Sequence, residues 1–295
     1  MKRSADDSGV FDRHVTEGIT MLKRERVRVN RYGKKLTRLV TPLMASALMF
    51  SACSSASNES VMDRVKKSNV MKVGFEGKYE PFNMTNDKNE FTGYDVDISN
   101  EIAKRIGVKT QFIATDFDSL IGGLKADKFD IVIAQMTATE ERKKEVDFTA
   151  TYTINGATVG VKENSDIKGI NDLKNKTIGA GSGTTFLDEA KKVEGAKVKE
   201  YNSPTDITTD LINGRIDAII QDELSFAYQI KQHNLPIKLV GGVLYKDVMG
   251  MAVKKNNKEF LNAVDKALAD MKKDGTLTAI YKKWFNIEPD PETLK

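Results

Sequence analysis

Cysteine, histidine and tryptophan are scarce in this chain, with one, two and one among 295 residues. A single cysteine excludes a disulfide within the chain. The two histidines are His14, near the N-terminus, and His233, just before the turn 234–236, so a Cys–His or Ser–His nucleophilic pair has little support. The sequence also shows no cluster of metal-ligand residues. We therefore expect no catalytic residue, no metal and no cofactor.

Long apolar runs are missing as well. The run Leu39–Phe50 is shorter than the roughly 20 residues that span a bilayer, and Pro42 interrupts it. It follows a basic stretch at 23–38 and precedes Ser51-Ala52-Cys53. This order of basic, apolar and small residues is typical of a secretory signal rather than of a membrane-spanning helix.

The segment Met49–Cys53 resembles a bacterial lipobox, in which a cysteine after small residues is lipidated and becomes the mature N-terminus. Phe50 stands where leucine is usual. We predict a leader over 1–53, lipid attachment at Cys53, a polar tether over 54–69, and anchoring to the outer face of the cell membrane, on the periplasmic side in a Gram-negative source. The alternative is an incidental cysteine in an ordinary signal. The mixed-charge residues 1–20 leave Met1 and Met21 both open as the translation start.

Excess positive charge is also absent from the body of the chain. Residues 1–53 hold 11 Lys/Arg against 5 Asp/Glu, which leaves 35 basic and 37 acidic residues in 54–295. With a net charge of −2, the body offers no basic surface for nucleic acid or an acidic membrane, and we exclude nucleic acid as a partner. Its length provides for two lobes rather than one core.

From residue 70 onwards, short apolar runs alternate with helical periodicity, and the alternation restarts at 176. This pattern predicts an α/β fold of two lobes, each a mainly parallel sheet with helices on both faces. The strands expected are 71–75, 110–113, 129–134, 176–180, 215–220 and 250–253, and the helices expected include 95–107, one through 120–124, one from about 185, 261–271 and 277–285.

The first chemically informative segment is 76–82, directly after the first strand, where an open α/β sheet places its ligand residues. One interpretation gives Glu76 a polar ligand group and makes Tyr79 an aromatic wall. The other is a turn built on Gly77 and Pro81, with Glu76 in solvent. The segment alone favours the turn.

The second segment, 135–142, also follows a strand and has Thr139 as a plausible helix N-cap. Arg142 is unusual because a cation in the first turn opposes the helix dipole, which suggests a role other than helix stability. The alternative is a solvated arginine paired with Glu140 or Glu145, and both interpretations stay open.

Two further segments follow strands in the second half of the chain. The loop 182–185 offers backbone N–H groups at a helix start, which suit a carboxylate, and it lacks the lysine of a nucleotide-binding loop. Asp222 ends a run too apolar to leave it solvated, so it needs a partner. That partner is a ligand ammonium, or Asp222 is the N-cap of a helix.

Taken together and in order, the motifs resemble the polar amino-acid-binding proteins of ABC importers, family 3 of the bacterial extracellular solute-binding proteins. The resemblance covers 70–285 and rests on the segments 76–82, 93–97, 137–144, 146–148, 214–218, 274–276 and 283–285. The Glu-Gly-x-Tyr run and the Thr-Ile-Asn-Gly after Tyr152 look most like the cystine-binding branch.

The resemblance implies a role for each matching residue. Arg142 would clamp the ligand α-carboxylate, helped by N–H groups at Thr137 and Thr185, while Glu76 would meet the distal polar group. Asp222, the Thr137 hydroxyl and the carbonyl of Gln135, a position where many relatives have Gly, would hold the α-ammonium. Aromatic rings would stack on the side chain. The predicted ligand-binding residues are Glu76, Tyr79, Phe117, Gln135, Met136, Thr137, Arg142, Gly183, Thr184, Thr185 and Asp222.

The resemblance further implies a type II binding-protein fold with two hinge crossings. We predict lobe 1 over 70–151 and 251–287, lobe 2 over 157–245, and hinges at 152–156 and 246–250. The expected function is extracytoplasmic capture of a polar amino acid, with L-cystine as the first choice and glutamine, arginine or histidine as alternatives. A monomer would deliver it to a membrane permease. Two rivals remain: a dehydratase-like enzyme using Glu76 and Asp222 as acids, and a surface adhesin, which no residue supports.

Overall fold

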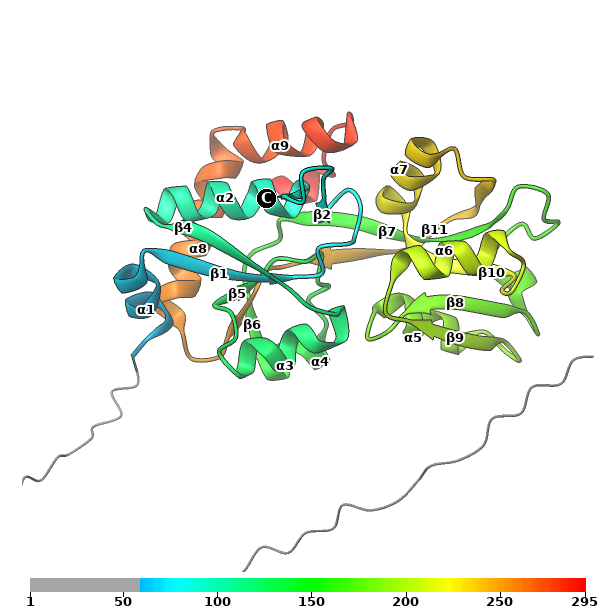
Figure 1. The fold of residues 1–295 in the computed structure, drawn as a ribbon, viewed down its shortest axis with the longest axis horizontal. Helices are drawn as coiled ribbons and strands as arrows, with labels where there is room; N and C mark the ends of the chain where they lie inside the picture. Colours follow the sequence, from blue (N-terminus) through cyan, green and yellow to red (C-terminus); the bar gives the residue numbers. More distant parts are fainter. Residues whose placement is uncertain (1–58) are drawn as a thin grey trace, which may run out of the picture. The chain divides into compact units, whose positions relative to one another are not determined.

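The computed structural model describes residues 59–295, which form two lobes, each built on a five-stranded sheet (Figure 1). The predicted leader, Cys53 and residues 54–58 of the tether lie outside this part. The first sheet has the order β4 (Lys109–Ala114), β1 (Val70–Phe75), β5 (Ile131–Val132), β12 (Ala252–Lys254) and β6 (Val146–Phe148). The second has the order β11 (Ile237–Met249), β7 (Thr153–Lys162), β10 (Ala218–Asp222), β8 (Thr177–Gly181) and β9 (Lys197–Tyr201). A two-stranded sheet joins β2 (Met84–Thr85) and β3 (Phe91–Thr92).

Four of the five strands in each sheet run in the same direction. In the first sheet β1 is parallel to β4 and β5, and β12 is antiparallel to both of its neighbours. In the second sheet β8 is parallel to β9 and β10, and β7 is the antiparallel strand. The predicted mainly parallel α/β architecture with two lobes is confirmed.

Helices cover both faces of the sheets. They are α1 (Val61–Ser68), α2 (Tyr94–Ile106), α3 (Leu120–Lys125), α4 (Glu140–Glu145), α5 (Thr185–Lys192), α6 (Pro204–Ile212), α7 (Glu223–His233), α8 (Lys258–Lys273) and α9 (Thr276–Phe285), with short 3₁₀ turns at η1 (Phe117–Ser119), η2 (Ile170–Leu173) and η3 (Pro291–Leu294). In the first lobe, residues 131 and 133 point into the core under α2, α8 and α9, and residues 132 and 134 point into the core under α3. This period of two, with both faces buried, explains the continuous apolar run of that strand. None of the helices in residues 59–295 is long and apolar enough to cross a membrane.

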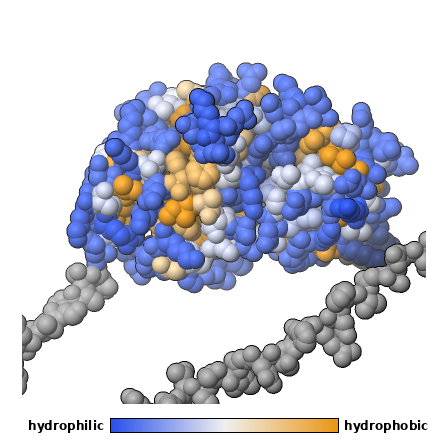
Figure 2. All heavy atoms as spheres, viewed as in Figure 1, coloured by the Kyte–Doolittle hydropathy of each residue, from blue (hydrophilic) through white to orange (hydrophobic). Residues whose placement is uncertain are grey.

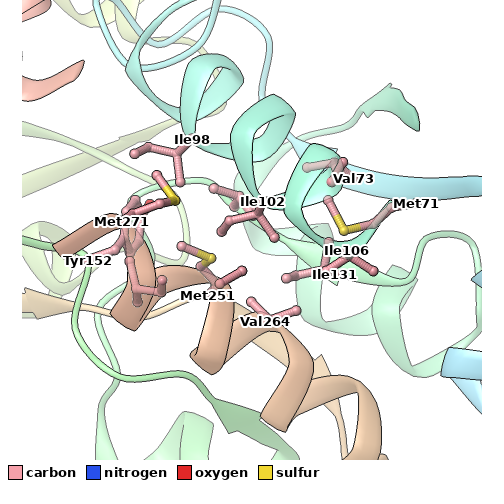
Figure 3. Packing of buried hydrophobic residues seen from close by; sticks show 14 of the residues in the cluster. Met71, Val73, Ile98, Ile102, Ile106, Ile131, Tyr152, Met251, Val264 and Met271 are labelled. Carbon is pink, nitrogen blue, oxygen red and sulfur yellow. The ribbon is translucent and has the colours of Figure 1, made fainter. Parts of the chain in front are cut away.

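Helix α2 shows how local sequence signals position the larger core. Ile98, Ile102 and Ile106 recur at helical spacing and pack against Val264 and Met271 of α8 (Figure 3). Basic residues in its last turn complement the helix dipole, and the chain then turns at residue 107 in a left-handed conformation. Polar side chains cover most of the visible surface, and hydrophobic residues show in smaller patches on both lobes (Figure 2).

The prediction of a polar tether reaching residue 69 is wrong for the described part of that segment. Residues 61–68 form helix α1, whose Val61 and Val65 are buried against the first lobe. The side chain of Ser60 caps the helix by accepting a hydrogen bond from the N–H of Asp63 at 3.1 Å. Met62 also packs against this core, and Arg64 forms an ion pair with Asp130 at 2.8 Å, so apolar and polar contacts together hold the segment.

Several strand boundaries also differ from the predictions. Strand β5 is shorter than 129–134, β10 begins three residues later than predicted, and β7, β9 and β11 were not predicted from the pattern. Strands β7 and β11 run from one lobe into the other (Figure 1), paired from Thr153 opposite Met249 to Ala157 opposite Tyr245. The predicted hinge ranges 152–156 and 246–250 overlap this ladder at 153–156 and 246–249, and their hinge role stays a prediction.

Candidate ligand-binding site

A pocket lies between the two lobes, at the ends of the strands. Glu76 follows β1, Gln135 follows β5, Asp222 ends β10, and the loop at 181–185 follows β8. The pocket holds about 690 Å³ of space, part of it open to solvent. Carboxyl ends of parallel strands are where open α/β sheets bind ligands. Nine of the eleven predicted residues line it: Glu76, Tyr79, Phe117, Gln135, Thr137, Arg142, Thr184, Thr185 and Asp222.

Glu76 begins a tight loop that returns at Asn83. Tyr79 and Asn83 pair through both backbone N–H groups, at 2.6 and 2.9 Å, and the N–H of Gly77 donates to Asn83 Oδ1 at 2.8 Å. The turn interpretation was therefore right about the backbone but wrong about Glu76, which lines the pocket instead of facing solvent. Burial raises the pKa of Glu76 to about 7, and the nearby charge of Lys78 opposes this shift.

Gln135 has a left-handed backbone, with φ of +50°. Glycine adopts this conformation readily, whereas a residue with a side chain adopts it only at a cost. Its side chain is 6% exposed and donates through Nε2 to Asp95 and Tyr152. Its Oε1 has no hydrogen-bond partner among residues 59–295.

Arg142 points out of α4 into the pocket, with the helix capped by Thr139. Its Nη1 donates to the carbonyl of Thr137 and its Nη2 to that of Gly183, both at 2.8 Å, and the guanidinium lies 5.3 Å from the ring centroid of Phe117. Burial lowers the pKa of Arg142, and the opposing effect of nearby carboxylates such as Asp247 is smaller.

The alternative partners for Arg142 are occupied by other residues. Glu140 pairs with Lys143 at 2.9 Å, and Glu145 pairs with Lys125 at 2.8 Å. The solvated-arginine interpretation is therefore wrong. Within residues 59–295 the guanidinium donates to the two carbonyl oxygens of Thr137 and Gly183, which a ligand carboxylate could replace.

Asp222 is buried at the junction of β10 and α7, with 1% exposure. Its Oδ1 accepts from the N–H of Ser225 at 2.8 Å, so the N-cap interpretation is confirmed. Its Oδ2 accepts from the amide of Asn155, and the residue also lines the pocket. Burial raises the pKa of Asp222 to about 8.

A family model described as bacterial extracellular solute-binding proteins, family 3, matches residues 71–287. The chain belongs to this family. The L-cystine-binding protein TcyJ of Escherichia coli (strain K12) is 36% identical over 250 residues, which cover 83% of this chain and 94% of TcyJ. The resemblance drawn from the motifs is confirmed.

Two solved structures of amino-acid-binding proteins match this family 3 chain closely. An ancestral arginine-binding protein bound to glutamine has a TM-score of 0.71 and 40% identity, covering 74% of this chain and 99% of that chain. The ancestral amino acid-binding protein AncCDT-1, a precursor of cyclohexadienyl dehydratase, has a TM-score of 0.72 and 36% identity, covering 77% of this chain and 100% of that chain. Both support the type II two-lobe assignment.

Two predicted residues of this family 3 protein do not line the pocket. Met136 is 1% exposed and packs in the core of the first lobe. Its neighbours Gln135 and Thr137 line the pocket, while Met136 faces the core of the first lobe. Gly183 contributes its backbone, since its carbonyl accepts from Arg142.

Sequence reasoning missed several acidic and polar groups around the pocket. Asp116 and Asp118 line it on either side of Phe117, and Asp116 forms an ion pair with Lys78 at 2.8 Å. Asp247, on the unpredicted strand β11, accepts from the Thr185 hydroxyl at 2.9 Å. The lining residues thus contain four carboxyl groups and one guanidinium. Such a site suits an amino acid that carries a further positive or donor group beyond its α-ammonium.

Proposed function

We propose that this family 3 protein binds a polar amino acid between its lobes outside the cytoplasm and delivers it to the permease of an ABC importer. The observation that carries the proposal is the placement of Arg142 on the first lobe and Asp222 on the second, both facing one pocket. Every α-amino acid carries a carboxylate and an ammonium that match these two groups. The ligand would therefore connect the lobes and favour the closed form, with β7 and β11 as the hinge.

L-cystine is the proposed ligand. The relative TcyJ is named for cystine binding, and the acidic pocket fits the two ammonium groups of cystine. In this arrangement Glu76 meets the distal ammonium, and Tyr79 and Phe117 contact the chain between the two ends. Arginine, glutamine and histidine remain the alternatives, because each also ends in a hydrogen-bond donor.

Thermal melting with each common amino acid and with cystine tests the proposal. A ligand that binds only the native state raises the melting temperature according to its concentration and affinity. We expect selective protection by cystine and no protection by glutamate or aspartate. If neither cystine nor any common amino acid raises the melting temperature, the result would count against amino-acid binding altogether.

The enzyme alternative has one specific observation behind it, namely the likeness to AncCDT-1, a precursor of a dehydratase. The relatives found are otherwise solute-binding proteins, and we infer that this chain is a binding protein too. Product analysis after incubation with the tightest-binding amino acid separates the two functions: a transport protein returns its ligand unchanged. The adhesin alternative has no observation in its favour.

Membrane attachment through Cys53 is part of the proposal, and Cys53→Ala is its test. We expect the variant to fold and bind normally but to leave the membrane fraction, because it lacks the lipid chains proposed to hold the protein there. Fractionation of cells, followed by mass spectrometry of the mature protein, measures this. Unmodified Cys53 in membrane-bound wild-type protein would contradict lipidation.

Affinity should rise with pH between about 5.5 and 7.5. In the ligand-free protein the pKa values of Glu76 and Asp222 are raised to about 7 and about 8, so these carboxyls hold protons at neutral pH. A bound ammonium favours the ionised carboxylate and lowers both pKa values, so binding releases protons and strengthens as pH rises. The gain is up to about tenfold per pH unit for each proton released.

Calorimetry in buffers with different ionisation enthalpies counts the released protons directly. The variant Glu76→Gln should release fewer protons than wild type. Equal affinity at both ends of this pH range, with no buffer effect on the enthalpy, would contradict the assignment of buried carboxyls to the ligand.

A further inference from the structure

We propose that Asp95, which is buried and does not line the pocket, is a positioning residue that fixes the geometry of the pocket through hydrogen bonds to Asn83, Gln135 and Tyr152. The inference rests on the proposed function, since its main measurement is ligand affinity. Asp95 belongs to the motif 93–97 and is fully buried in the first turn of α2. Asp95 makes none of the proposed ligand contacts, so ligand binding does not by itself explain a carboxylate in that place. A buried carboxylate is stable only where hydrogen-bond donors surround it.

One oxygen of Asp95 holds two residues that matter to the pocket. Its Oδ1 accepts from Gln135 Nε2 at 2.7 Å and from the Tyr152 hydroxyl at 3.0 Å. The same hydroxyl accepts from the N–H of Gln135 at 2.9 Å. Gln135 is therefore fixed through both its side chain and its backbone, which stabilises the left-handed conformation that a non-glycine residue adopts only at a cost.

The other oxygen of Asp95 controls the loop that carries Glu76. Its Oδ2 accepts from Asn83 Nδ2 at 2.8 Å, and Asn83 Oδ1 accepts from the N–H of Gly77, the residue after Glu76. Asn83 also closes the loop through its backbone pairing with Tyr79. Asn83 therefore connects Asp95 by hydrogen bonds to the loop that carries Glu76 and Tyr79, which both line the pocket.

The chemistry of a carboxylate fixes which way each neighbouring amide faces. An ionised carboxylate only accepts hydrogen bonds, so Gln135 and Asn83 must both turn their NH₂ groups toward Asp95. The oxygen of Asn83 is then left for Gly77, and the oxygen of Gln135 is left without a partner. Burial raises the pKa of Asp95 to about 7, and its three donors oppose that shift, so the ionised form that orients both amides predominates above that pH.

The network also reaches the crossing between the lobes. Tyr152 directly precedes β7, the strand that enters the second lobe, and lies within the predicted hinge range 152–156. Asp95 therefore links the loop of Glu76, the residue Gln135 and the start of a lobe crossing in one buried network.

Asp97, two residues along the same helix, provides a matched control. Its Oδ2 accepts from Lys283 Nζ at 2.6 Å and from Trp284 Nε1 at 2.7 Å, which ties α2 to α9. None of these residues lines the pocket. Asp97→Asn should lower the melting temperature while leaving ligand affinity within about threefold of wild type.

The experiment compares Asp95→Asn, Asn83→Asp and the double variant Asn83→Asp/Asp95→Asn, with L-cystine, L-arginine, L-histidine and L-glutamine as probes. In each single variant two groups of the same kind face each other. In the double variant the amide and the carboxylate exchange places, and every hydrogen bond of the network can form again. We expect each single variant to lose about 10- to 100-fold in affinity for the ligand that wild type binds best, since an unsatisfied buried group has a cost of that order. The double variant should return to within about threefold of wild type.

Hydrogen exchange of the ligand-free proteins over residues 76–83 gives a readout that does not depend on the ligand. Exchange should be faster in Asp95→Asn, near wild type in the double variant, and unchanged in Asp97→Asn. If wild type binds none of the four probes, the proposed function fails, and the exchange pattern still tests the network by itself.

Three outcomes would overturn the inference. One is a folded Asp95→Asn with wild-type affinity and exchange. Another is a folded double variant as impaired as the single variants, which would mean that the charge at position 95 itself matters. The third is a double variant that fails to fold. This variant keeps every hydrogen bond through which we propose that Asp95 acts, so the inference requires it to fold.

Discussion

Replacing Arg142 by alanine or by lysine will lower amino-acid affinity by roughly two to four decades. Removing one partner of a buried charge pair costs about 3–5 kcal/mol, and about 1.4 kcal/mol corresponds to a factor of ten in affinity. Lysine cannot replace arginine here, because the planar guanidinium offers two parallel donors to a carboxylate and an ammonium does not. The Arg142 side chain already presents both Nη groups to acceptors at 2.8 Å.

Isothermal titration calorimetry measures the loss, and Lys143→Ala is the control. Lys143 follows Arg142 in the same short helix, but it is exposed and pairs with Glu140. The control should bind normally. Ligand-free Arg142→Ala should keep its fold by circular dichroism, since it gives up only two hydrogen bonds to backbone carbonyls. Binding by Arg142→Ala within a few-fold of wild type would show that the proposed site is wrong.

Asp222→Asn should weaken binding by about two decades or more, because the ligand ammonium loses its buried counter-charge. Asparagine is as good an N-cap as aspartate, so helix α7 should remain intact. The variant should also lose most of the proton release, since the pKa of Asp222 is the higher of the two raised pocket carboxyls.

The neighbouring Glu223→Gln makes the same chemical change outside the pocket lining and should bind like wild type. Calorimetry at pH 7.5 compares the two variants. An Asp222→Asn protein that binds as tightly as Glu223→Gln would restrict Asp222 to its role as a helix cap.

Site residues could be predicted from the sequence where a charged side chain is unfavourable for the helix or strand that carries it. Arg142 could be singled out because its charge opposes the dipole of its own helix, and Asp222 because it ends an apolar strand. Both lie in the pocket. The pattern could not separate Met136 from its neighbours, since which side of an extended segment faces a cleft depends on the second lobe.

Other features depend on contacts between distant segments. Asp247 lies on β11, a strand broken by a register shift between Val240 and Tyr245 that hides its alternation in the sequence. Asp95 belonged to a motif that served recognition of the family, but its partners Asn83, Gln135 and Tyr152 come from three separate segments. Helix α1 was missed because only its packing against the first lobe reveals the two valines as core residues.

Calorimetric titration of the mature protein with L-cystine tests the central claim most directly. The account predicts saturable binding of one ligand per chain, lost in Arg142→Ala and retained in Lys143→Ala. No heat of binding with L-cystine, L-arginine, L-histidine or L-glutamine, from a protein shown to be folded, would contradict it.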